Sequence, residues 1–166
     1  MVTPQSTDAM IRTTTSATHK TLLQSFRALA INEGLKDPKS RECKDRRKQF
    51  FTENVQAGFK SHFGTNARSL NEWKRLLNTI GIEGSSGLKS VKQCKEASPP
   101  ALKGKFINIV DLVDAGNARK TITKPNPFTS EEALSGYIKR TEKIFPKDSA
   151  KANPLLKQFL IAIGGD

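Results

Sequence analysis

The sequence is poor in the residues that build disulfide frameworks, metal sites and membrane spans. It has two cysteines, Cys43 and Cys94, and two histidines, His19 and His62, in 166 residues. Two distant cysteines do not make a disulfide framework or a Cys-x-x-Cys site, and neither histidine has a metal-ligand spacing. No apolar run reaches the length of a membrane span, and residues 1–20 lack the apolar core of a signal peptide. We therefore expect an intracellular protein, nuclear or cytoplasmic, without membrane contact, metal or other cofactor.

Acidic residues are also in short supply. The chain has 16 Asp and Glu against 28 Lys and Arg, a formal net charge of +12, and each half carries 14 basic and 8 acidic residues. A domain charged in this way attracts polyanions such as nucleic acid, or acidic proteins. Solubility alone is the simpler explanation of the same charge.

The apolar residues that are present recur at helical spacing. The pattern predicts one all-α domain of six or seven helices over residues 19–166, after a disordered polar tail at 1–18. Ser40, Ser69, Thr129 and Asn153 are expected to cap helices, with capping boxes at Ser69–Glu72 and Thr129–Glu132. We expect the helices to occupy about residues 20–33, 41–63, 70–80, 88–97, 109–115, 131–145 and 154–163.

The segment "INIVDLVDAGN" at 107–117 admits two interpretations. Its β-branched residues are typical of a buried strand, but Asn108 as a cap and Gly116 as a stop favour a short helix. The following "RKTITKPNP" at 119–127 is expected to be a loop.

Catalytic machinery is not visible in the sequence. There is no phosphate-binding glycine loop, and Cys43 and Cys94 fall on apolar faces, where core packing is the expected role. Asp111 and Asp114, with Glu131 or Glu132, could in principle hold a divalent metal, but a solvated acidic face is favoured. We therefore expect a protein that is not an enzyme.

Basic residues gather in three places. The first cluster starts a helix that follows "KDP", and it is interspersed with acids; its members are Lys36, Lys39, Arg41, Lys44, Arg46, Arg47 and Lys48. The second cluster has a single acid, Glu96, and comprises Lys89, Lys92, Gln93, Lys95, Lys103 and Lys105. The third is the loop group Arg119, Lys120 and Lys124. Such clusters can neutralise phosphates, although a solvated charged face is the alternative for each.

The helix "SLNEWKRLLNTIGI" followed by "LKSVKQCKEA" raises the question of a helix-turn-helix motif. In that motif Lys89, Lys92 and Gln93 would reach bases or phosphates from a recognition helix at 88–97. The connection between the two segments is longer than the usual turn, which speaks against the motif. Trp73 lies within an apolar stripe, so we expect it in the core instead of stacked on a base.

Four short motifs give the chain a resemblance to a family. A Trp-bearing helix that ends in Gly-Ile, "SVKQCKEA", "NIVDLVDA" and "KIFPKDSAKANPLLKQFL" together resemble a family of small, basic, helical fungal proteins whose function is not known. The resemblance covers about residues 20 to 163 and implies a shared fold, and it transfers no catalytic residue. The chain departs from the family in the prolines of "EASPPALKGK".

The sequence thus predicts a protein that binds DNA or RNA mainly through phosphate contacts, with low sequence specificity. The alternative is an adaptor or regulatory module whose basic face docks an acidic protein partner. An adaptor would show an apolar patch beside its cations, whereas an enzyme would show a deep pocket with convergent ionisable groups. The oligomeric state does not follow from the sequence.

Overall fold

The fold is all α-helical, as predicted. The computed structural model describes residues 19–102, 106–118 and 128–164, and the predicted disordered tail at 1–18 and the predicted loop at 119–127 lie outside these ranges. Within them, backbone pairing of the β type is limited to one isolated antiparallel bridge between Phe106 and Phe128. The helices are α1 (Leu22–Asn32), α2 (Arg41–Phe63), α3 (Leu70–Ile80), α4 (Val91–Leu102), α5 (Ile109–Asn117), α6 (Glu131–Thr141) and α7 (Pro154–Gly164), with the short 3₁₀ helices η1 (Ser85–Gly87) and η2 (Lys147–Ala152).

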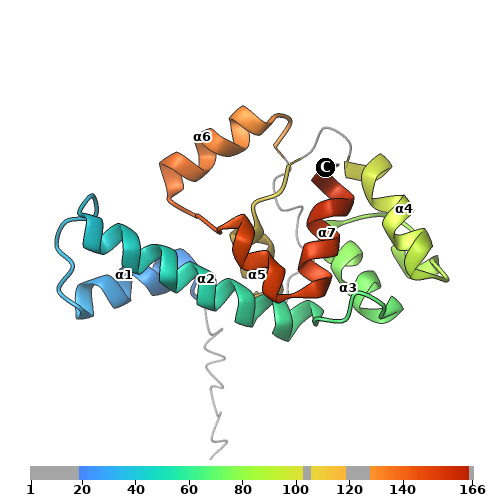
Figure 1. Cartoon of the computed structure of the whole chain (residues 1–166), viewed down its shortest axis with the longest axis horizontal. Helices are drawn as coiled ribbons and strands as arrows, with labels where there is room; N and C mark the ends of the chain where they lie inside the picture. Colours follow the sequence, from blue (N-terminus) through green and yellow to red (C-terminus); the bar gives the residue numbers. More distant parts are fainter. Residues whose placement is uncertain (1–18, 103–105, 119–127, 165–166) are drawn as a thin grey trace, which may run out of the picture.

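Helix α2 organises the molecule. It runs along the long axis, with α1 beside its first half and α3, α4 and α7 gathered at its far end (Figure 1). An α-helix rises about 1.5 Å per residue, so these two ends lie about 30 Å apart along α2. Helix α5 packs against the middle of α2, and α4 lies between α3 and α7 in contact with both.

One hydrophobic cluster connects these helices. Its largest fully buried side chains include Trp73, Phe51, Phe59, Phe63 and Phe159. The indole Nε1 of Trp73 donates a hydrogen bond to the carbonyl oxygen of Ala67 at 2.9 Å, which satisfies its polar atom. The two cysteines are buried as well. The predicted core positions of Trp73, Cys43 and Cys94 are therefore confirmed.

Most predicted helix ends are confirmed, and two capping boxes are not. Ser40, Asn108 and Asn153 accept hydrogen bonds from the first turns of α2, α5 and α7. Helix α6 is capped by Ser130, one residue after the predicted Thr129. At α3 the Ser69 hydroxyl accepts from the Glu72 amide, but the Glu72 carboxylate turns to the Asn66 amide at 2.7 Å.

Helix α5 forms instead of a strand, and its glycine has another role than the predicted one. The helix continues through Gly116 to Asn117. A Cβ at Gly116 would lie 2.9 Å from the His62 ring, so glycine permits that ring to pack on α5. Gly58 plays the same part on α2, because a Cβ there would lie 2.4 Å from Val113 Cγ1. Two glycines thus allow α2 and α5 to approach closely.

Helix α4 contradicts one further expectation. The sequence predicts its end at Pro99 and Pro100, yet the helix continues to Leu102. Prolines inside a helix remove backbone donors and strain the preceding turn. Packing along α3 and α7 outweighs that loss, and the Ser98 hydroxyl adds a hydrogen bond to the carbonyl oxygen of Cys94 at 2.8 Å.

Across the described ranges, the helices are all too short or too polar to traverse a bilayer.

Candidate nucleic-acid interface

The first predicted cluster begins α2 and is largely occupied by its own acids. Arg46 makes a two-pronged contact with Glu33, with Nε 3.0 Å and Nη2 2.9 Å from the carboxylate oxygens. This contact lowers the pKa of Glu33 and raises that of Arg46. Arg41 lies 3.7 Å from Asp45 in an exposed pair. Four members are exposed and have no acid within salt-bridge distance among the described residues: Lys36, Lys39, Lys44 and Lys48.

Arg47 does not belong to a phosphate-binding surface. Its side chain is buried, with Nη2 3.0 Å from Glu142 Oε2 and its guanidinium carbon 5.2 Å from the Phe26 ring centroid. The sequence interpretation assumed that every cation at the start of α2 points to solvent. Arg47 instead falls on the same helical face as Cys43, four residues earlier, and is buried together with the apolar residues of that face.

The second cluster is only partly inside the described ranges. Lys89, Lys92 and Gln93 are exposed at the start of α4, and Lys95 is half-buried. Lys92 faces Glu96 in an exposed pair, and the Gln93 side-chain oxygen accepts from the Lys89 amide at 2.7 Å. The predicted residues Lys103, Lys105, Arg119 and Lys120 lie outside the described residues.

The helix-turn-helix interpretation fits poorly. Helices α3 and α4 pack against each other, but residues 81–90, including η1, separate them, where the motif has a turn of three or four residues. Gln93, a candidate for base contacts, is engaged in capping α4. The exposed lysines of α4 remain suited to phosphate contact.

A basic pocket that the sequence did not reveal lies where α4 meets α7. Its cations come from four elements: Arg68 precedes α3, Lys95 is on α4, Lys151 on η2 and Lys157 on α7. Ala67, Pro154 and Gln158 complete the lining of a cavity of about 380 Å³, and no acidic residue of the described ranges lines it. We call this the α4–α7 basic pocket. The sequence does not indicate this pocket, because its four cations are dispersed over 90 residues and only folding brings them together.

Neighbouring contacts orient the cations of the α4–α7 basic pocket. Lys95 Nζ donates to Gln158 Oε1 at 3.1 Å and lies over the Trp73 ring, 5.9 Å from its centroid. Asn153 caps the start of α7 beside the pocket, and the dipole of that helix favours negative charge there. Lys151 pairs with Asp148 at 2.8 Å, but both side chains are highly exposed, so the pair is weak.

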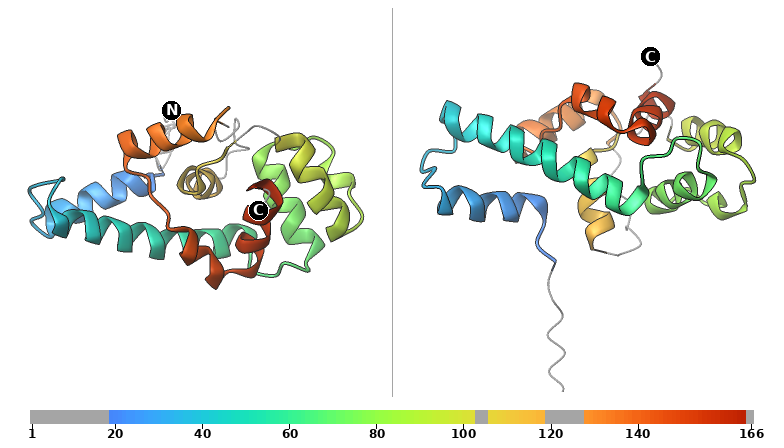
Figure 2. Two further views of the ribbon diagram at one scale, coloured as in Figure 1. Left: turned by 45° about the horizontal axis from the view of Figure 1, so that its top comes forward. Right: turned by 60° about the horizontal axis from the view of Figure 1, so that its bottom comes forward.

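The two basic regions lie at opposite ends of the molecule. The start of α2 and the α4–α7 basic pocket are separated along the long axis in every view (Figures 1 and 2). They therefore do not form one continuous basic face, which is evidence against a single phosphate-binding surface built from both regions. The sequence alone identified the cluster at the start of α2 and, of the pocket, only Lys95, and it gave no relative position for them.

The acidic residues weighed for metal binding are used structurally. Asp111 pairs with Lys143, which also donates to the Tyr137 hydroxyl at 3.0 Å. Burial lowers the pKa of Lys143, but its hydrogen bonds to these two partners outweigh burial and raise it overall. Asp114 is part-buried and its Oδ1 accepts from the Leu22 amide at 2.8 Å. The predicted solvated acidic face is therefore wrong.

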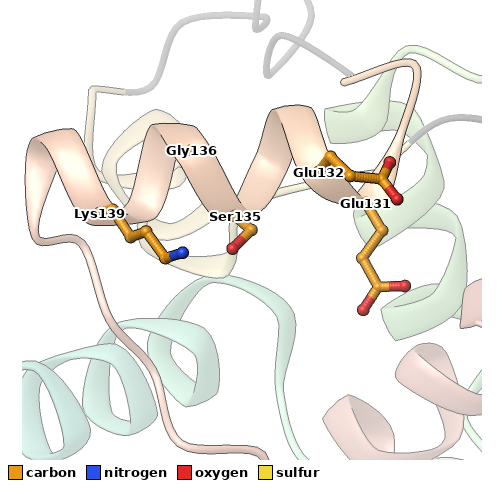
Figure 3. Close-up of a pocket in the computed structure, with 5 residues that line it drawn as sticks. All are labelled: Glu131, Glu132, Ser135, Gly136 and Lys139. Carbon is orange, nitrogen blue, oxygen red and sulfur yellow. The ribbon is translucent and has the colours of Figure 1, made fainter.

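Glu131 and Glu132 lie elsewhere, at the start of α6. They line an open hollow with Ser135, Gly136 and Lys139 (Figure 3). Over the described residues, no group of three His, Cys, Asp or Glu side chains has a metal-binding arrangement. Burial raises the pKa of the Cys94 thiol, which opposes formation of a reactive thiolate. His62 Nε2 is hydrogen-bonded to the side-chain oxygen of Asn117.

Comparisons of the chain with protein-family models, with curated proteins and with solved structures find no match. The resemblance to the fungal family therefore stays a prediction. The arguments about function that follow rest on the geometry of this chain.

Proposed function

We propose that the protein binds nucleic acid through phosphate contacts made at the α4–α7 basic pocket. One observation carries the proposal: four cations from four separate elements converge on a concave surface that no acid lines. Converging cations are costly to assemble, because like charges repel, and a bound polyanion relieves that cost. A merely solvated face would disperse its charges or intersperse them with acids, as the start of α2 does.

The exposed lysines of α4 extend this surface. Lys89 lies just before α4 and Lys92 in its first turn, so a backbone leaving the pocket towards the start of α4 would meet Lys92 and then Lys89. Lysine ammonium groups contact phosphates without reading bases, and low sequence specificity follows. DNA and RNA both offer such a backbone. The exposed lysines at the start of α2 add long-range attraction in this proposal, not direct contact.

The proposal describes a binding protein and not an enzyme, with residence in the nucleus or cytoplasm. It is supported by the structural use of the acidic residues and by the raised pKa of Cys94. An adaptor function is the second candidate, and the apolar groove described below favours it at the other end of the molecule.

Fluorescence anisotropy tests the proposal. Labelled duplex DNA, single-stranded DNA and RNA are titrated with the protein at several salt concentrations. We expect binding whose logarithm falls linearly with the logarithm of salt concentration, by about 0.9 per phosphate contact on a duplex and about 0.7 on a single strand. Absence of binding to all three ligands at low salt would end the proposal.

A further inference from the structure

A groove between α1 and α2 is the most unusual surface at the other end of the molecule. It has a volume of about 420 Å³ and lies between α1, the loop that follows it and the first turns of α2. Its walls are mainly apolar, with Leu23, Phe26, Ala30, Leu35 and Pro38 among them. We call this the α1–α2 groove. Soluble proteins bury such surface unless a ligand or partner uses it.

The rim of the α1–α2 groove exposes a large apolar side chain. Ile31 is 79% exposed, far more than Ile144 at 43% and Ile161 at 54% among the large apolar side chains of the described residues that reach solvent. A single exposed isoleucine is ordinary, but one on the rim of an apolar groove enlarges the surface that a partner can cover. The feature is typical of a docking site with a desolvated centre.

The charges around the groove define the chemistry of its occupant. Arg27, Lys36 and Arg47 line it, and Glu142 is the one acid that does. Glu142 is already paired with Arg47, while Arg27 and Lys36 are exposed. An occupant with apolar side chains and nearby carboxylates would complement both the walls and the rim.

Arg47 is a second, independent indication that the groove binds a ligand, because one of its donor atoms lacks a hydrogen-bond acceptor. It is 5% exposed and lines the groove, yet its Nε has no hydrogen-bond partner. Glu142 Oε2 contacts the guanidinium at Nη2, 3.0 Å away. A buried donor without an acceptor is destabilising, and a guanidinium is shaped to hold a carboxylate through two donors.

We propose that the α1–α2 groove binds a segment of a partner protein that combines apolar side chains with carboxylates. The apolar side chains lie against Phe26, Leu35 and Ile31, and the carboxylates lie at Arg27, Lys36 and the guanidinium of Arg47. This site is at the opposite end from the α4–α7 basic pocket, so it goes beyond the proposed function and does not depend on it. A protein with both sites would link an acidic partner to nucleic acid.

Selection from a phage-displayed library of random peptides tests the groove directly with the full chain. We expect enrichment of peptides that place Asp or Glu near Leu, Ile or Phe. Binding of a labelled selected peptide should weaken at least about ten-fold in R27E/K36E and in I31D. These residues are exposed, so both variants should fold, which circular dichroism checks.

The controls separate the groove from charge alone and from the first proposal. The matched variant K44E/K48E makes the same charge change at exposed positions outside the groove lining and should retain peptide binding. Enrichment of basic peptides, enrichment of none, or equal binding by all variants would overturn the proposal. Dimerisation that I31D abolishes would also overturn it, because a second copy would then cover the groove. Loss of nucleic-acid binding in the anisotropy experiment leaves these outcomes unchanged.

Discussion

The two ends of α2 hold their cations in different ways. At the start of α2, Arg46 is clamped by Glu33, Arg41 lies beside Asp45, and Arg47 is drawn into the apolar stripe. At the far end, cations from four elements converge on a pocket without an acid in its lining. The number of Lys and Arg in a segment is therefore a poor guide to a binding surface. What matters is whether the charges converge on one concave surface or are dispersed along a helix and partly paired.

The difference has a physical basis in chain connectivity. Charges close together in sequence acquire counter-charges within one or two helical turns, and such pairs stabilise the local fold. Among the described residues of the pocket, Lys151 has such a local partner in Asp148, but that pair is exposed and weak, so the charges that tertiary packing brings together retain a field that a ligand can use. The α4–α7 basic pocket is of the second kind, and we expect it to dominate binding.

The largest expected effect comes from neutralising the pocket. R68Q/K151Q/K157Q removes three exposed cations and should weaken nucleic-acid binding at least about ten-fold, with the salt slope reduced by about 0.9 per lost duplex contact. The matched variant K39Q/K44Q/K48Q changes the net charge equally at the start of α2 and should lose less affinity and little slope. Anisotropy titrations at several salt concentrations measure both. Equal losses in the two variants would refute the distinction between the ends.

The next effect concerns the stability of the contact between α2 and α5, in the middle of the molecule. G58A places a Cβ 2.4 Å from Val113 Cγ1 at the contact of α2 with α5, and should lower the free energy of unfolding by about 1–3 kcal/mol. G136A is the control, because no atom lies within 4 Å of its added Cβ, and it should be neutral or slightly stabilising. Urea unfolding measures both. Equal stability of G58A and the unaltered chain would mean that the helices can separate without cost.

A third prediction compares how much two arginines of α2, Arg47 and Arg41, contribute to the stability of the fold. R47A removes the pair with Glu142 and the contact with Phe26, and should lower the free energy of unfolding by about 1–2 kcal/mol, less than for a fully buried pair because Glu142 is 39% exposed. R41A removes an exposed pair and should change it by less than about 0.5 kcal/mol. Thermal unfolding compares the two variants. A larger effect of R41A would contradict the structural role given to Arg47.

The smallest effect is a pH dependence at Asp114, where α5 meets the start of α1. Burial raises the pKa of this carboxyl. Because the folded chain then binds the proton more tightly than the unfolded chain, the carboxyl's contribution to stability rises as pH falls through the folded pKa towards the unfolded value. D114N keeps an oxygen acceptor for the Leu22 amide and carries no charge. It should exceed the unaltered chain in stability at neutral pH, and this difference should shrink in acid; a difference that grows in acid would contradict the prediction.

The sequence predicted the fold better than the surface. Helical spacing and the caps Ser40, Asn108 and Asn153 are local signals, and the helices follow them. The errors came where tertiary packing decided: α4 continues through Pro99 because its neighbours hold it, and Arg47 is buried because its helical face is. Local patterns do not contain that information.

The candidate site was predicted in part for the same reason. Lys95 was identified from its own segment, but Arg68, Lys151 and Lys157 stand alone in the sequence among polar and apolar neighbours. Their convergence depends on α7 packing along α4, a contact between segments about 60 residues apart. Asn153 as a cap indicates that a helix begins there, but it does not indicate which other elements that helix packs against.

Nuclear magnetic resonance is the most direct test of the central claim that phosphate binds at the α4–α7 basic pocket. Backbone amide shifts of the full chain are followed while a short oligonucleotide is added. The account predicts that the largest changes occur around Arg68, Lys95, Lys151 and Lys157, and that amides around Lys39 and Lys44 change little. Changes centred on the start of α2, or no localised changes at saturating oligonucleotide, would contradict it.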